Sequence, residues 1–241
     1  MNLVIDIGNT RIKAALFERD RLFKQYSFLS EDLSKIKQKM QISDLDSVIV
    51  SSVNEEKTKE IINLFPKAIL FSHHFNLPIE IAYENKNQLG LDRIAAAVGA
   101  HFLYPNSPLL IIDAGSAITF DFLGDKAVFL GGNISPGLQF RFRSLHQYTS
   151  KLPLVVANEE TNLISKTTEE AINSGVIRGI CYEIEKYIEE YQNNYENLTS
   201  ILTGGDTYFF DRILKKRIFA EENLVLIGLN QILKYNNVDK I

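Results

Sequence analysis

One short pattern occurs twice in this chain, 107 positions apart, and it constrains the fold more than any other feature. The first copy reads LVIDIGNT over residues 3–10, and the second reads LIIDAGSA over residues 110–117. Each copy begins with an apolar run typical of a buried strand, contains an aspartate and a glycine, and is followed by a second strand-like run. The repeat predicts two related halves.

The residue types in each copy suit a loop that binds phosphate. Glycine lets the backbone turn tightly and present N–H groups to an anion, and a nearby hydroxyl adds a donor. An aspartate such as Asp6 or Asp113 can hold a cation against a polyphosphate. Asp-X-Gly is also common in ordinary hairpin turns, and for either copy alone that interpretation is the better one. The matched pair favours two loops that clamp a nucleotide.

Composition excludes several other classes of protein. The 241 residues are 45% hydrophobic and 23% charged, which is ordinary for a globular protein. The net charge of −4 argues against a nucleic-acid binder that relies on a basic face. Cys181 is the only cysteine, so no intrachain disulfide forms. The sequence has no secretion-type apolar segment or membrane-length apolar run. We therefore expect a cytoplasmic protein with no nucleic-acid or membrane partner.

Strand-like and helix-like segments alternate along the chain. Outside the two repeats, strands are expected at 22–28, 47–51, 68–71 and 200–202, and one more ends at residue 130. Helices are expected at 31–40, 55–64, 90–103, 168–192 and 221–234. The segment 131–137 is predicted to be a glycine-rich loop. It has no lysine in the P-loop position, and no Gly-x-Gly-x-x-Gly follows a strand, so both commoner nucleotide signatures are excluded.

Several motifs in one order resemble those of the type III pantothenate kinase family. They are DIGNT at 6–10 with Lys13, GLDR at 90–93, DAGSA at 113–117, the glycine-rich 131–137, KTTEEA at 166–171 and LTGGD at 202–206. The resemblance covers nearly the whole chain. It implies an α/β fold with two ribonuclease-H-like subdomains, related by internal duplication, with an ATP cleft between them. The expected subdomains are 1–108 with the first phosphate loop, and 109–241 with the second phosphate loop and an adenosine loop.

The resemblance also implies an activity. The family phosphorylates pantothenate with ATP to give 4′-phosphopantothenate, the first step of coenzyme A biosynthesis. It implies a homodimer, Mg²⁺ or another divalent cation bound with ATP, and a monovalent cation, K⁺ or NH₄⁺. Two alternatives stay open: a kinase of the same superfamily that acts on another small hydroxy acid or sugar, and a non-catalytic regulator that binds nucleotide.

Positions that match the family motifs receive roles from that resemblance. ATP binding falls on Asp6, Ile7, Gly8, Asn9, Thr10, Arg11, Ile12, Lys13, Ser116, Gly204 and Gly205. Asp6 would also hold Mg²⁺, and Asp113 would be the ligand of the monovalent cation. Ser116 stands where the family usually has a threonine, and the hydroxyl is kept.

Pantothenate binding falls on Tyr83, Gly90, Leu91, Asp92, Arg93 and Thr168. We expect Asp92 to be the catalytic base, although an aspartate at a helix start is otherwise a cap. Arg93 has the forked geometry that clamps a carboxylate, or it pairs with a nearby glutamate. Thr168 would reach the pocket of the partner subunit, or else cap its own helix. From the residues alone the apolar stripe of that helix is expected to pack on its own core, whereas the resemblance favours packing on a second copy.

Overall fold

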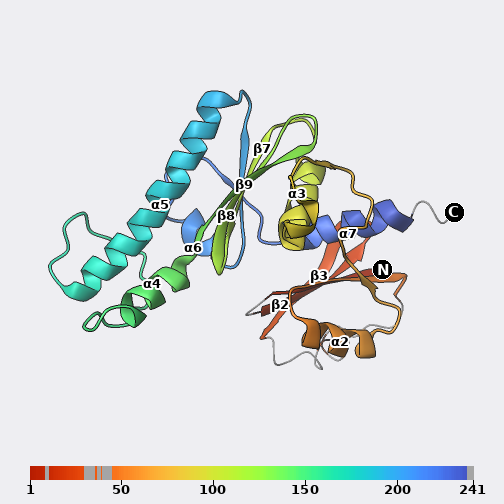
Figure 1. The fold of residues 1–241 in the computed structure, drawn as a ribbon, viewed down its shortest axis with the longest axis horizontal. Coiled ribbons are helices and arrows are strands. Elements are labelled where there is room, and N and C mark those ends of the chain that lie inside the picture. Colours follow the sequence, from red (N-terminus) through yellow and green to blue (C-terminus); the bar gives the residue numbers. More distant parts are fainter. Residues whose placement is uncertain (9–10, 30–35, 37–38, 40–44, 238–241) are drawn as a thin grey trace. The chain divides into compact units, whose positions relative to one another are not determined.

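The computed structural model describes residues 1–8, 11–29, 36, 39 and 45–237. Two compact units make up the chain, Met1–Pro105 together with Leu224–Ile241, and Asn106–Asn223. The sequence-based division placed the last helix in the second half, whereas this helix packs in the first unit (Figure 1). The helix expected at 31–40 falls largely outside the described residues.

The first unit is built on a five-stranded sheet. Its strands are β1 (Asn2–Ile7), β2 (Arg11–Glu18), β3 (Arg21–Leu29), β4 (Ser47–Ser52) and β5 (Ile69–Leu70). The strand order is β3-β2-β1-β4-β5, with β1 antiparallel to β2 and parallel to β4. The other elements are α2 (Glu55–Leu64), β6 (Glu80–Ile81), the 3-10 turn η1 (Lys86–Gln88), α3 (Leu91–Leu103) and α7 (Leu224–Asn237).

The second unit repeats that connectivity. Its strands are β7 (Leu109–Ala114), β8 (Ala117–Leu123), β9 (Val128–Pro136), β10 (Thr199–Thr203) and β11 (Phe219–Ala220). They lie in the order β9-β8-β7-β10-β11, with β7 antiparallel to β8 and parallel to β10. The helices are α4 (Leu138–Gln147), α5 (Thr168–Asn194) and α6 (Thr207–Asp211). The two matching sheets confirm the predicted duplication and the ribonuclease-H-like fold of each unit.

The duplicated hairpins differ by one residue. The N–H of Gly8 donates to the carbonyl of Arg11 at 3.0 Å, whereas the N–H of Gly115 donates to the carbonyl of Ala117 at 3.0 Å. Because the second turn is shorter, Asp113 faces Thr119 across the sheet, where Asp6 faces Lys13. Thr119 is thus the structural counterpart of the lysine.

The glycine-rich segment 131–137 is mostly strand, and its prediction as a loop was wrong. Gly132 in β9 pairs with Asp121 in β8, and a Cβ there would lie 2.0 Å from the carbonyl oxygen of Phe120. The glycine is needed because the two strands approach closely, not because the chain turns. Helix α4, which follows directly, was not predicted.

Helix α5 covers the apolar core of the second unit (Figure 1). Its buried stripe consists of Ile172, Val176, Ile177, Ile180, Ile184 and Ile188. These side chains share one core with Leu110, Ile112 and Phe120 of the sheet, and Tyr187 stacks on Phe120 with 4.0 Å between ring centroids. The expectation from the resemblance that this stripe packs on a second copy was therefore wrong, because the stripe is already buried in the core of its own unit. No helix in the described part of the chain is long and apolar enough to cross a membrane.

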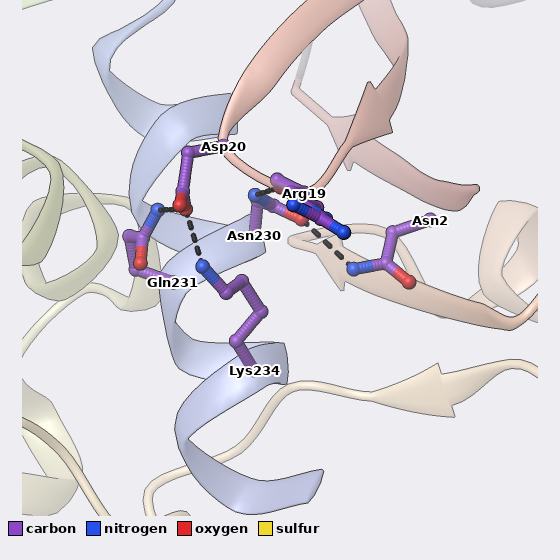
Figure 2. Close-up of polar contacts among 6 residues, drawn as sticks. All are labelled: Asn2, Arg19, Asp20, Asn230, Gln231 and Lys234. Atoms are coloured by element: carbon purple, nitrogen blue, oxygen red, sulfur yellow. Dashed lines mark hydrogen bonds and ion pairs between the residues drawn. The ribbon is translucent and has the colours of Figure 1, made fainter. Parts of the chain in front are cut away.

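Polar side chains join helix α7 to strand β1 and to the turn between β2 and β3 (Figure 2). Asn230 is fully buried; its Nδ2 donates to the carbonyl of Arg19 at 2.8 Å, and its Oδ1 accepts from Asn2 at 3.1 Å. Asp20 accepts from Gln231 at 2.7 Å and pairs with Lys234. Burial acts to raise the pKa of Asp20, but the hydrogen bonds from Gln231 and Lys234 outweigh it and lower that pKa.

Candidate functional site

The predicted first phosphate loop joins β1 and β2. Asp6 lies half-buried near the end of β1, in register with Lys13 on β2. Ile7 and Ile12 flank the turn and are fully buried, so their side chains anchor the loop in the core rather than face a ligand. Arg11 is exposed, and its Nε donates to Ser27 at 2.8 Å. The predicted ligand residues Asn9 and Thr10 lie outside the described residues.

The predicted second phosphate loop lies directly against the predicted adenosine loop. Gly204 follows β10 with φ +101°, and a Cβ there would lie 2.4 Å from both Asp113 Oδ1 and the carbonyl oxygen of Ala114. The N–H of Asp206 donates to that same carbonyl at 2.9 Å. The motifs that contain Asp113 and Gly204 are about 90 residues apart in the sequence. They nevertheless form one surface at the ends of β7 and β10.

The start of α4 completes this surface. The N–H of Gly137, the N-cap of α4, donates to the carbonyl of Ser116 at 3.2 Å, and a Cβ on Gly137 would lie 2.1 Å from the carbonyl oxygen of Gly115. Arg141 fixes the approach, because its Nε donates to the carbonyl of Pro136 at 2.8 Å. The Ser116 side chain stays exposed. Arg141 was not predicted, since its role depends on contacts that no local motif records.

A second group of predicted residues lies at the start of α3. Gly90 is the N-cap and makes no side-chain cap bond. Asp92 is exposed in the first turn, where its Oδ1 accepts from the N–H of Arg93 at 2.8 Å. A Cβ at Gly90 would lie 2.4 Å from that oxygen. Asp92 is therefore not the N-cap residue, and its carboxylate is open to solvent at the end of a rigid helix.

Arg93 and Tyr83 are brought together, as the sequence-based assignment of both to substrate requires. The guanidinium carbon of Arg93 lies 5.9 Å from the centroid of the Tyr83 ring. Arg93 is buried, and a cation held over an aromatic face is stabilised and restricted in orientation. The arrangement presents a pre-oriented fork that suits a carboxylate ligand.

Thr168 is exposed at the first residue of α5. The cap of this helix is Thr167, whose Oγ1 accepts from the N–H of Glu170 at 3.2 Å. The Glu170 carboxylate in turn accepts from the N–H of Lys166 at 3.0 Å. The alternative that Thr168 caps its own helix is wrong, and its hydroxyl is left for another partner.

Within the described residues, no group of three or more His, Cys, Asp and Glu side chains is arranged to hold a metal ion. Magnesium in kinases is commonly held by one or two carboxylates together with substrate phosphates, so a single aspartate such as Asp6 suits it. Cys181 is an inert thiol rather than a nucleophile, because burial raises its pKa to about 11.

Comparison with known proteins decides the family. The family model described as type III pantothenate kinase matches residues 2–190. The chain belongs to the type III pantothenate kinase family. A type III pantothenate kinase from Cytophaga hutchinsonii is 43% identical to it over 238 residues, covering 98% of this chain and 100% of the relative. The prediction of the family from six short motifs is confirmed.

Two solved structures resemble the fold of this family member. A Campylobacter jejuni protein described as a Baf family transcriptional activator has a TM-score of 0.66 and 25% identity, covering 98% of this chain and 99% of that one. The activator of 2-hydroxyisocaproyl-CoA dehydratase from Clostridium difficile, solved with bound ADPNP, has a TM-score of 0.55 and 14% identity, with 99% and 97% covered. The second likeness concerns the fold alone.

Proposed function

We propose that this protein transfers the terminal phosphoryl group of ATP to pantothenate, forming 4′-phosphopantothenate in the first step of coenzyme A biosynthesis. The observation that carries the proposal is family membership over residues 2–190, joined to an exposed carboxylate beside an oriented arginine at the start of α3. Because ATP is the donor, we assign the enzyme to the cytoplasm.

Asp92 is the proposed base. Its exposed carboxylate accepts the proton of the pantothenate hydroxyl as that oxygen attacks the terminal phosphorus. Arg93 clamps the carboxylate of pantothenate, while Tyr83 holds the guanidinium in position. Gly90 and Leu91 bring the backbone close to the substrate at the start of the helix. Positioning of this kind supplies much of the catalysis in phosphoryl transfer.

The nucleotide roles fall on both duplicated loops. Asp6 is the proposed Mg²⁺ ligand and Lys13 a phosphate contact, together with the backbone around Gly8. Asp113 is the proposed ligand of a monovalent cation, and Ser116 donates to ATP. Gly204 and Gly205 form the adenosine loop. When bound at Asp6 and Asp113, the two cations would neutralise charge that develops on the phosphoryl group.

We also propose a homodimer in which Thr168 contributes to the pocket of the partner. The α5 stripe is buried in its own core, so a different surface must join the subunits. The segment 148–164, just before α5, exposes large apolar side chains: Tyr148 is 82%, Val156 85%, Leu163 80% and Ile164 81% exposed. Exposed apolar surface is common at protein interfaces, and a second copy of the chain is the occupant that we assign to this segment.

The experiment that tests the function is a coupled assay of purified protein with ATP, Mg²⁺ and K⁺, using a panel of hydroxy acids and sugars beside pantothenate. We expect turnover with pantothenate and little with the others. Turnover with another acceptor would move the enzyme elsewhere in the superfamily. Nucleotide binding without turnover on any acceptor would support a regulator instead.

A further inference from the structure

The backbone around Asp206 is held in place from both sides. Its N–H donates to the carbonyl of Ala114 at the end of β7. The hydroxyl of Thr207 donates to the carbonyl of Gly204 at 2.8 Å, which closes the turn from β10 into α6. Gly204 itself has no room for a side chain. The backbone position of Asp206 is therefore set by the fold of the second unit.

The side chain of Asp206 does not cap helix α6. Asp206 is the N-cap of α6 but makes no side-chain cap bond, because the N–H groups of Phe209 and Phe210 bond to its backbone carbonyl at 3.1 Å each. Among the described residues, no hydrogen bond or ion pair reaches the carboxylate, although it is half-buried. Burial alone raises its pKa. A half-buried carboxylate without a donor destabilises the fold, which indicates a role in binding.

Open space adjoins Gly205, the residue before Asp206. A Cβ placed on Gly205 would meet nothing within 4 Å, and Gly205 is exposed. The neighbouring Gly204, in contrast, is pressed against Asp113 and Ala114 of the second phosphate loop. The loop is therefore packed against Asp113 and Ala114 at Gly204 and open at Gly205, the residue before Asp206.

We propose that Asp206 binds the ribose of the nucleotide, with its carboxylate accepting hydrogen bonds from the 2′- and 3′-hydroxyl groups. The proposal rests on the nucleotide-binding part of the proposed function. A carboxylate only accepts, and two neighbouring hydroxyls offer it two donors; an acidic side chain serves the ribose in this way in dinucleotide-binding folds. Ribose also lies next to the phosphates in a nucleotide, as Asp206 lies next to the phosphate loop.

The test is calorimetric binding of ADP, 2′-deoxy-ADP, 3′-deoxy-ADP and IDP, in Mg²⁺ and K⁺, to the wild type and Asp206→Asn. Since hydrogen bonds to charged groups change affinity by roughly ten- to a hundredfold, the wild type should bind ADP at least about tenfold more tightly than either deoxy form. Asp206→Asn should bind ADP, 2′-deoxy-ADP and 3′-deoxy-ADP with affinities within about twofold of one another, because the amide is a poorer acceptor. Asp211→Asn, at an exposed position on the same helix, should keep the wild-type preference.

An unchanged ribose preference in Asp206→Asn would overturn the proposal, as would absence of nucleotide binding to the wild type. If Asp206→Asn changes only the ratio of the affinities for ADP and IDP, the proposal is also overturned, since that result assigns Asp206 to the adenine base. The outcome is separable from the proposed function. Ribose discrimination without pantothenate turnover would remove only the kinase assignment, whereas turnover with unaltered discrimination would remove only the role of Asp206.

Stability gives a readout that a purely structural role would reverse. The raised pKa of Asp206 means that folding favours its protonated form, so the wild type loses stability as pH rises through that pKa. Without nucleotide, Asp206→Asn and Asp206→Ala should melt at or above the wild-type temperature at pH 8, with the difference shrinking towards pH 4. A lower melting temperature for Asp206→Ala alone would identify a helix cap and contradict the proposal.

Discussion

The carbonyl oxygen of Ala95 on α3 occupies the space where a side chain at Gly228 on α7 would lie. A Cβ on Gly228 would fall 1.7 Å from that oxygen, and the reciprocal position Gly99 faces the carbonyl of Leu224 at 2.3 Å. The two helices therefore touch backbone to backbone. Ala95 lies one turn after Asp92, so α7 sets the position of the helix that carries the proposed base.

Gly228→Ala should force these helices apart. Overpacking of this kind typically costs about 1–3 kcal/mol, and the shift should lower kcat because small misplacements of reacting groups slow catalysis. Thermal unfolding and steady-state kinetics measure the two effects. Gly175→Ala is the matched control, since that helical glycine has nothing within 4 Å of its added Cβ. A functional Gly228→Ala protein of wild-type stability would contradict the close contact.

Asp92→Asn should lose most of kcat while the fold survives, because Asp92 is exposed and the amide keeps the shape but does not accept the proton. Loss of a general base lowers rates by roughly a hundred- to ten-thousandfold. Kinetics together with a melting curve separate chemistry from folding. If Asp92→Asn turns over near the wild-type rate, Asp92 is not the catalytic base and has only a structural role at the start of α3.

Arg93→Lys should raise KM for pantothenate far more than KM for ATP. Lysine keeps the charge but lacks the planar fork that binds a carboxylate through two hydrogen bonds. Pantothenol, which has no carboxylate, provides the check. If it binds the wild type as tightly as pantothenate does, the clamp is assigned wrongly.

Activity should rise with K⁺ or NH₄⁺ and respond much less to Na⁺, and Asp113→Ala should abolish that dependence with most of the activity. A monovalent cation beside the triphosphate would fix phosphate geometry and neutralise developing charge. Rates measured across the three chlorides at constant ionic strength test this. Equal rates in K⁺ and Na⁺ would count against a cation ligand at Asp113.

A shared pocket predicts complementation between two defective proteins. Asp92→Asn and Thr168→Arg, each nearly inactive alone, should regain activity after co-refolding, because one of the two pockets in a mixed dimer combines an intact Asp92 with an intact Thr168. Each variant refolded alone is the control. The absence of rescue, or a fully active monomer in sedimentation, would refute the shared pocket.

Local patterns were enough to predict most of this fold. The strands around Asp6 and Asp113 are buried on both faces, so they stand out as continuous apolar runs. The prediction of a loop at 131–137 was wrong because Gly132 allows the close approach of β9 to β8. In a sequence, a glycine with this role looks the same as a glycine in a turn. The packing of α7 depended on Gly99 and Gly228, two glycines that have no visible connection until the helices meet.

The same distinction applies to the candidate site: residues in a local motif were predictable, and contacts between residues far apart in the chain were not. Asp92 and Arg93 are neighbours in the chain and form a recognisable motif, so their pairing at one helix start was predictable. Arg141 was not, since its contact with the carbonyl of Pro136 follows from the start of an unpredicted helix. That no described residue bonds to the Asp206 carboxylate is likewise a three-dimensional fact, which the motif alone does not contain.

The place of α7 in the first unit has a consequence for synthesis. That unit is made from two stretches of chain, Met1–Pro105 and Leu224–Ile241, with the whole of Asn106–Asn223 between them. On the ribosome, the second unit therefore emerges complete before the first has received the helix that carries Asn230. We expect the second unit to finish folding before the first, because the first unit becomes complete only after α7 has been synthesised.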